Sequence, residues 1–300
     1  MQSLCVLTVH AHPDDEASKG AGTVARYHAG GVHTVLVTCT GGEEGDILNP
    51  AMDKEDVREN LTEVRRQELQ RAAEIIGYDE VVMLGYRDSG MPDSPANGDP
   101  RSFAAAPLEE AVGRLVAVIR RTRPQVIVTY PRDQSGYPHP DHLRVNEISE
   151  IAFDAAGDPD RYPDAGPVWQ PLRLCYVAWS TKRMRAMYDK FVELGIDPPI
   201  SDERLARLLK AESGDPDDVR PPPARPRIVV DLHGHTAVMR EALLAHATQV
   251  DPNSPWWFGL PPEVGDSVYP YDEYEVARDL TGQTNPTDDL FAGVDAVAVR

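Results

Sequence analysis

The sequence predicts an α/β fold in which a mostly parallel sheet is flanked by helices, followed by an irregular C-terminal half. Two observations lead to this prediction. Strand-like and helix-like segments alternate through the first half of the chain, as they do in successive βαβ units. The strand-like segments are also apolar nearly throughout, which is typical of strands that helices cover on both faces of a sheet. Such a sheet is Rossmann-like.

Each predicted element has its own pattern of residues. The segments predicted as strands in the first half are short apolar runs: Leu4–Val9, Thr34–Thr40, Glu80–Leu84 and Gln125–Tyr130. The segments predicted as helices are longer: Gly20–Ala29, Glu59–Ile76, Leu108–Thr122 and His142–Ala156. In the second half, Leu172–Ala178 and Arg227–Leu232 resemble strands and Thr236–Thr248 resembles a helix. Gly77 directly follows a predicted helix, in the position of a C-cap.

The length allows one large domain or two small ones, and we expect a single catalytic domain over residues 1–300. Residues 181–226, which are rich in proline and aspartate from Asp197 onward, are predicted to form a surface excursion, and residues 227–300 a C-terminal capping region. The segment from Asp251 to Tyr271 holds several aromatic residues between prolines. It either caps the site or covers the core.

Composition excludes several classes of function. The net charge of -19 disfavours nucleic acid and anionic membrane surfaces as partners. Three cysteines without a CxxC pair predict neither a disulfide framework nor a thiolate zinc site. The N-terminus lacks a signal peptide, and no apolar run is long enough to span a membrane. We therefore expect a soluble, cytoplasmic protein with a small-molecule substrate; the sequence does not predict its oligomeric state.

Two motifs carry the residue types of a metal site. HPDDE at 12–16 follows the first predicted strand and packs three carboxylates together, whose mutual repulsion a bound cation relieves. GYPHPDH at 136–142 follows the strand that ends at Tyr130, on a loop stiffened by prolines. The carboxyl ends of parallel strands share one edge of a sheet, so the two motifs should meet. A histidine and a carboxylate from the first loop, with a histidine from the second, would complete a catalytic zinc site. The alternatives are an acidic surface turn and a rigid surface loop.

Other motifs are weaker. Residues 20–25 (GAGTVA) match a dinucleotide fingerprint, but the charged motif separates them from their strand, so close helix–sheet packing is the better interpretation. The loop GGEEG at 41–45 lacks the lysine of a P-loop; it is either a flexible turn or a substrate-lining loop that carries Asp46. No GxSxG elbow or credible cysteine–histidine pair supports a serine or cysteine hydrolase.

The sequence AHPDDE followed by HPDH resembles the LmbE/PIG-L family of metal-dependent N-deacetylases and amidases. Within it, Lys19, GGEEGDILNPAM at 41–52, DSGMP at 88–92 and AHATQVDP at 245–252 are most similar to the branch of mycothiol S-conjugate amidases. The resemblance implies an α/β fold, one divalent metal, either zinc or ferrous iron, and hydrolysis of the cysteinyl–glucosamine amide in thiol S-conjugates. The alternatives are deacetylation of N-acetylglucosaminyl-inositol, a specialised paralogue in a biosynthetic pathway, and a binding module without catalysis.

The resemblance also implies roles for individual residues. The metal ligands fall on His12, Asp15 and His142. The remaining catalytic roles fall on Asp14 as general base, His139 as a second protonatable group, Tyr137 at the oxyanion and Asp141 as a partner that orients a histidine. Substrate contacts fall on Lys19, Arg65 and Asp88, each of which could instead be an ordinary surface or turn residue. Either Asp14 or His139 could protonate the leaving amine.

Overall fold

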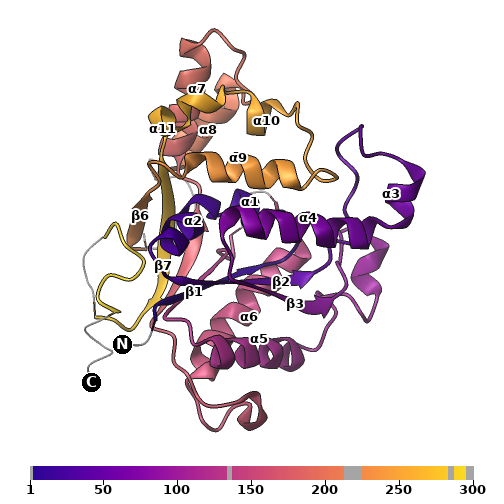
Figure 1. Ribbon diagram of the computed structural model, residues 1–300, viewed down its shortest axis with the longest axis vertical. Coiled ribbons are helices and arrows are strands. Elements are labelled where there is room, and N and C mark those ends of the chain that lie inside the picture. Colours follow the sequence, from indigo (N-terminus) through magenta and orange to yellow (C-terminus); the bar gives the residue numbers. More distant parts are fainter. Residues whose placement is uncertain (1–2, 134–136, 213–224, 283–286, 295–300) are drawn as a thin grey trace.

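A computed structural model describes residues 3–133, 137–212, 225–282 and 287–294 of the chain. Within these residues, seven strands form one sheet in the order β3-β2-β1-β4-β5-β7-β6 (Figure 1). Strands β1 to β5 run parallel to their neighbours, and β7 pairs antiparallel with both β5 and β6. The prediction of a mostly parallel sheet flanked by helices is therefore confirmed.

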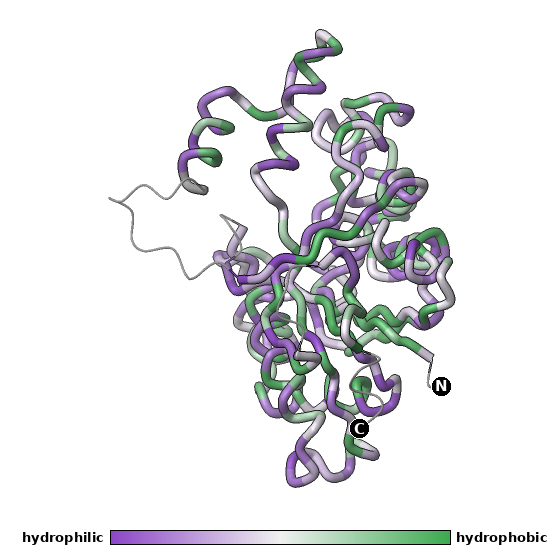
Figure 2. Tube along the Cα trace, turned by 90° about the vertical axis from the view of Figure 1, so that its left-hand side faces the viewer, coloured by the Kyte–Doolittle hydropathy of each residue, from purple (hydrophilic) through white to green (hydrophobic). Residues whose placement is uncertain are grey.

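The bounds of the strands are β1 Cys5–His10, β2 His33–Thr40, β3 Glu80–Tyr86, β4 Val126–Thr129, β5 Arg173–Ala178, β6 Arg227–Asp231 and β7 Tyr271–Asp279. The central strands β1 and β4 are buried along their whole length, as their apolar sequences predict. Figure 2 shows green, hydrophobic stretches of the trace in the middle of the molecule. Strand β7 was not predicted, because five of its nine residues are charged. It is nevertheless a central strand, held between β5 and β6.

The bounds of the helices are α1 Asp15–Ser18, α2 Ala21–Ala29, α3 Glu55–Glu59, α4 Leu61–Ile76, α5 Leu108–Thr122, α6 Pro140–Ala156, α7 Thr181–Glu193, α8 Asp202–Glu212, α9 Thr236–Ala245, α10 Pro255–Phe258 and α11 Gly265–Val268. Helices α5 and α6 pack together on one face of the sheet, while α2, α4 and α9 lie on the other (Figure 1). Helix α4 ends at Gly77, whose φ of +90° confirms the predicted C-cap.

The topology brings the two motifs to one edge of the sheet. Strands β1 and β4 are parallel neighbours, so the loops that follow them lie side by side. The first loop leads into the single turn of α1. The second loop leads into α6, whose N-cap is His139. The predicted meeting of the motifs therefore follows from strand pairing, before any contact between their side chains is considered.

Glycines at the start of α2 allow close packing, as the sequence predicts. A Cβ atom on Gly20 would lie 2.8 Å from the hydroxyl oxygen of Tyr274, and one on Gly22 would lie 3.0 Å from Cδ1 of Leu232. Gly20 also has a φ of +99°, which other residues rarely adopt. Both glycines thus fit α2 against the C-terminal part of the chain.

The segment predicted as a surface excursion contains helices α7 and α8, while its residues 213–224 lie outside the described part of the chain. A small cluster of Met184, Ile200 and Leu205 holds these helices together, and Trp256 packs against it.

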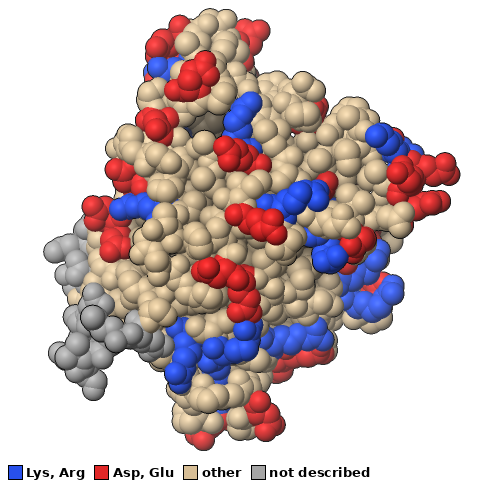
Figure 3. All heavy atoms as spheres, viewed as in Figure 1, with Lys and Arg blue, Asp and Glu red and all other residues tan. Residues whose placement is uncertain are grey.

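Charged side chains of both signs are spread over the molecular face in Figure 3. Among the described helices, none is long and apolar enough to cross a membrane.

Candidate metal centre

His12, Asp15 and His142 meet at the shared edge of the sheet, where all three are buried. The Oδ2 atom of Asp15 lies 3.6 Å from Nδ1 of His12 and 3.4 Å from Nε2 of His142. In a tetrahedral zinc site with bonds of about 2.0–2.1 Å, neighbouring ligand atoms are about 3.4 Å apart. The spacing and chemistry of these donors therefore fit a divalent metal ion.

A second group of donors, which shares His12, comprises His12, Asp88, His139 and Asp141. Its histidine from the second loop is poorly suited to be a ligand. The backbone N–H of Asp141 donates to Nδ1 of His139 over 3.2 Å, so the neutral imidazole carries its proton on Nε2. That Nε2 atom faces Oδ1 of Asp88 at 3.9 Å. A protonated nitrogen cannot coordinate a metal, which leaves His139 suited to carrying a proton.

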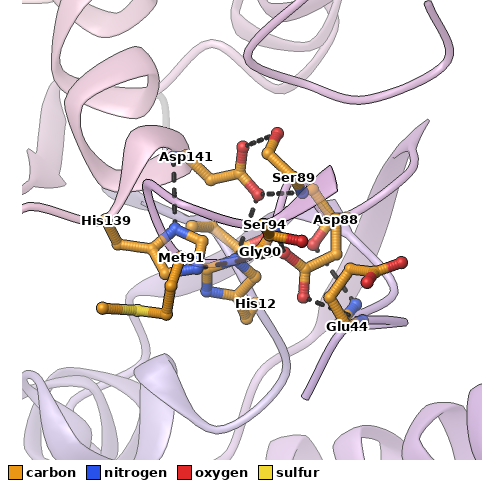
Figure 4. A network of polar contacts seen from close by, with 12 residues as sticks. His12, Glu44, Asp88, Ser89, Gly90, Met91, Ser94, His139 and Asp141 are labelled. Carbon is orange, nitrogen blue, oxygen red and sulfur yellow. Dashed lines mark hydrogen bonds and ion pairs between the residues drawn. The ribbon is translucent and has the colours of Figure 1, made fainter. Parts of the chain in front are cut away.

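The imidazole of His12 uses its two nitrogens for different tasks (Figure 4). Its Nε2 atom lies 3.2 Å from Oδ2 of Asp141 and 3.4 Å from Oδ1 of Asp88. Its Nδ1 atom faces Asp15, which Figure 4 does not label. Asp141 is itself held by Ser89, whose backbone N–H donates over 2.9 Å and whose hydroxyl donates to the other oxygen. A metal-binding histidine commonly donates its second N–H to a carboxylate in this way, which fixes the ring and its tautomer.

The carboxylates dominate the electrostatics of the centre. Burial alone would lower the pKa of His12, but hydrogen bonds to Asp141, Asp15 and Asp88 outweigh it and raise the pKa well above the usual value. For Asp15, burial is outweighed by Lys19, whose Nζ lies 2.6 Å from Oδ1, and by His142, so the pKa is lowered. Negative charge thus accumulates around the ring of His12, where a cation would be stabilised.

The pKa of His139 is shifted in the opposite direction to that of His12. Burial, together with the neighbouring His12, lowers the pKa of His139 to about 4. Its ring lies edge-on to that of His12, with centroids 4.5 Å apart. The half-exposed ring of Tyr137 lies 5.5 Å from that of His142 and 6.0 Å from that of His139, at the rim of the centre.

Asp14 projects beside the cluster without belonging to either donor group. Its backbone has a φ of +107°, an unusual value for a residue other than glycine. The Asp14 side chain keeps 31% of its surface exposed. Arg65 binds one carboxylate oxygen of Asp14 over 3.2 Å. Strained backbone of this kind is common at functional sites.

The four residues expected to contact the substrate differ in burial and in their distance from the donor group. Lys19 is in the centre through its ion pair with Asp15, and Asp88 through His12. Asp46 lies exposed in the loop after β2, outside the buried cluster. Arg65 is only 2% exposed, so it does not belong to a solvated helix face. It donates to the carbonyl oxygens of Gly42 and Pro13, and so joins the two loops that follow β1 and β2.

A buried ion pair next to Asp14, formed by Glu16 and His246, was not predicted from the sequence. Nε2 of His246 lies 2.5 Å from Oε1 of Glu16, and both side chains are fully buried. The other oxygen of Glu16 accepts the backbone N–H of Asp14 over 3.0 Å. The pair therefore holds Asp14 in its strained conformation. The two residues lie 230 positions apart, and no local pattern joins them.

We expect Glu16→Gln to lower kcat about tenfold at unchanged metal content, because small displacements of catalytic groups are costly. It should also lower stability by about 3–5 kcal/mol, since it leaves the buried imidazolium of His246 without its partner. The measurements are metal content, steady-state kinetics and thermal unfolding.

The matched control for this prediction is Glu68→Gln. Glu68 is equally buried and accepts hydrogen bonds from the backbone and the hydroxyl of Thr248, without touching Asp14. Both variants should be less stable than the wild type, but only Glu16→Gln should lose kcat. Equal kcat values in the two variants would assign the Glu16–His246 pair a purely structural role.

Comparison with known proteins agrees with this geometry. Residues 7–153 match the profile of a family described as PIG-L, GlcNAc-PI de-N-acetylase. The chain is 40% identical to a mycothiol S-conjugate amidase of Streptomyces coelicolor, over 97% of both chains. It is 37% identical to a 1D-myo-inositol 2-acetamido-2-deoxy-alpha-D-glucopyranoside deacetylase of Geodermatophilus obscurus, over 96% of this chain and 97% of that one.

A similar fold is found in N,N'-diacetylchitobiose deacetylase from Pyrococcus horikoshii, with a TM-score of 0.59, 16% identity, and coverage of 95% of this chain and 88% of that one. At this identity the likeness supports the fold alone. The similarity to the curated amidase and deacetylase, by contrast, extends along almost the whole chain. The chain therefore belongs to the PIG-L family.

Proposed function

We propose that this protein is a zinc-dependent amidase that cleaves the cysteinyl–glucosamine amide of mycothiol-type thiol S-conjugates. The products would be an amino-sugar inositol and an N-acetylcysteine adduct. The observation that carries the proposal is the meeting of three metal donors, His12, Asp15 and His142, beside the part-exposed carboxylate of Asp14. The sequence identity of 40% to a mycothiol S-conjugate amidase supports the substrate class.

In this proposal a divalent metal would be held by His12 through Nδ1, by Asp15 through Oδ2 and by His142 through Nε2. A divalent cation at this position supplies Lewis acidity, which polarises an amide carbonyl and lowers the pKa of water. Zinc suits two histidines and one carboxylate, and ferrous iron suits the same set. Anaerobic purification followed by metal analysis distinguishes the two. The native metal is the one that is present at about one equivalent per chain.

Asp14 serves as the general base in this proposal and takes a proton from the attacking water. Support comes from its position next to Asp15 in sequence and from its part-exposed side chain, which belongs to neither donor group. Tyr137 lies at the exposed rim, where its hydroxyl could donate to the developing oxyanion. The proton that the leaving amine requires comes from Asp14 after it has served as base, or from His139 in its protonated imidazolium form, which faces Asp88.

The functional test compares two substrates at equal concentrations of metal-loaded enzyme. One is a mycothiol S-conjugate, and the other is N-acetylglucosaminyl-inositol, on which the deacetylase relatives act by name. We expect release of the amino sugar from the conjugate to be at least about tenfold faster. Faster release of acetate would make the protein a deacetylase of the same family. Cleavage of neither amide at full metal occupancy would contradict both enzymatic functions.

A further inference from the structure

A cavity with aromatic walls lies between helices α2, α7, α9, α10 and α11 and has no part in the chemistry above. Its volume is about 150 Å³. The walls are largely apolar and include Trp179, Met187, Phe191, Trp256, Trp257 and Val268. Figure 1 shows α7, α10 and α11 beyond α9, at the end of the molecule that also carries α8, with α2 on the opposite side of α9.

The cavity belongs to the same edge of the sheet as the metal centre. Trp179 directly follows β5, which is parallel to β4, so it lies at the carboxyl edge that also carries the two motifs. Gly20 lines the cavity, and its neighbour Lys19 forms the ion pair with Asp15. Lys19, which contacts the proposed metal ligand Asp15, is therefore the residue next to a residue of the cavity wall.

The charged groups of the cavity are engaged with protein partners. Arg183 pairs with Asp272 at 3.4 Å and lies over the ring of Trp179, 4.9 Å from its centroid. Arg240 lies over the ring of Phe258 at 4.8 Å. The rest of the lining is mainly aromatic and aliphatic, with His235 and Thr236 as polar members. The rings of Trp179 and Trp256 are nearly parallel, with centroids 6.1 Å apart. Such walls suit a flat, uncharged, apolar group.

We propose that this cavity binds the apolar substituent on the sulfur of the thiol conjugate. The assignment rests on the proposed function and deepens it. The scissile carbonyl must lie at the metal, and the cysteinyl side chain that carries the substituent is on the acyl side of that bond. With the acyl side directed past Lys19, the substituent enters the cavity beyond Gly20. An acetyl group has no atoms that could reach it, so the cavity would serve an amidase and not a deacetylase.

The test uses the metal-loaded full-length protein and two conjugates of the same thiol, one S-methyl and one S-(2-naphthylmethyl). We expect kcat/KM to be at least about tenfold higher for the naphthylmethyl conjugate, because filling an apolar pocket contributes that much even for small groups. Similar kcat/KM values for the two conjugates would overturn the assignment of the cavity, while hydrolysis of both would leave the proposed function intact.

A cavity-filling variant makes the test specific. Ala237 lines the cavity and is exposed on α9, so Ala237→Trp should fill the space without disturbing the core. We expect it to lower kcat/KM about tenfold for the naphthylmethyl conjugate and less than about twofold for the methyl conjugate. The matched control is Leu244→Trp, on the same helix, 42% exposed and not part of the lining, which should change neither value.

The possible failures remain distinguishable. Equal losses on both conjugates in Ala237→Trp would indicate a general disturbance and overturn the assignment of the cavity. Hydrolysis of neither conjugate by the wild type, with acetate released from N-acetylglucosaminyl-inositol, would overturn the proposed function and the assignment together. A selective loss in Ala237→Trp that is absent in Leu244→Trp supports both.

Discussion

Asp15→Asn is expected to lower metal affinity at least about a hundredfold and kcat/KM about a thousandfold, because it removes the carboxylate that both histidines face. The substitution preserves the shape of the side chain, and the amide oxygen can still accept the hydrogen bond from the backbone of His12, but the ion pair with Lys19 is lost. Metal content after dialysis, titration of the metal-free protein and steady-state kinetics measure the two effects.

Asp88→Asn is the matched control, since it removes one charge from a carboxylate at a similar distance from the same imidazole of His12. Asp88 belongs to the second donor group, in which His139 carries its proton on Nε2. We expect this variant to retain its metal at least about tenfold more tightly than Asp15→Asn, since loss of a supporting carboxylate weakens binding less than loss of a ligand. The opposite order would assign the metal to His12, Asp88, His139 and Asp141.

The sequence was sufficient to predict the part of the site that local patterns encode. An apolar run that ends in a charged, proline-containing motif identifies a strand end, and parallel strands place such ends together. His12 and His142 were therefore expected to meet, although their motifs are far apart in sequence. Asp141, the residue before His142, contacts His12 from 129 positions away. This inference needed only the pairing of β1 with β4, and no knowledge of side-chain positions.

Contacts that depend on distant, unpatterned partners could not be predicted in this way. Glu16 was recognised only as one of three adjacent carboxylates, because no sequence pattern joins it to its partner His246, 230 positions away. Arg65 sits in a helix rich in Arg and Glu, a composition typical of a solvated face, yet the loops after β1 and β2 bury it. In both cases tertiary packing converts an ordinary charged residue into part of the site.

Strand β7 shows the same limitation for the fold. Its charged residues conceal the apolar pattern by which a central strand is recognised. They are tolerated because they have partners: the carboxylate of Glu273 accepts a hydrogen bond from Ser180, and Arg227 pairs with Glu275 across the strands. Because β7 carries Asp272 at the edge of the aromatic cavity, the unpredicted strand also helps to build that cavity.

Asp14→Asn is expected to lower kcat by about 10²–10⁴-fold while metal content stays at the wild-type level, because the amide cannot accept a proton from water. Asparagine is the appropriate replacement. It tolerates positive φ better than alanine does, so the backbone at +107° is not strained further, and its side-chain oxygen can still accept the hydrogen bond from Arg65. Loss of turnover then reports the missing base and not a displaced loop.

The effects of Asp14→Asn and Asp15→Asn separate two roles in adjacent residues. Asp14→Asn should lose kcat with its metal retained, whereas Asp15→Asn should lose the metal itself. Because Asp14 keeps 31% of its side chain exposed and Asp15 is buried, the two carboxylates face different surroundings despite being neighbours in sequence. A kcat within about fivefold of the wild type in Asp14→Asn would exclude Asp14 as the general base, since a positioned base contributes at least about a hundredfold. His139, the other protonatable group of the centre, would then be the group to test next.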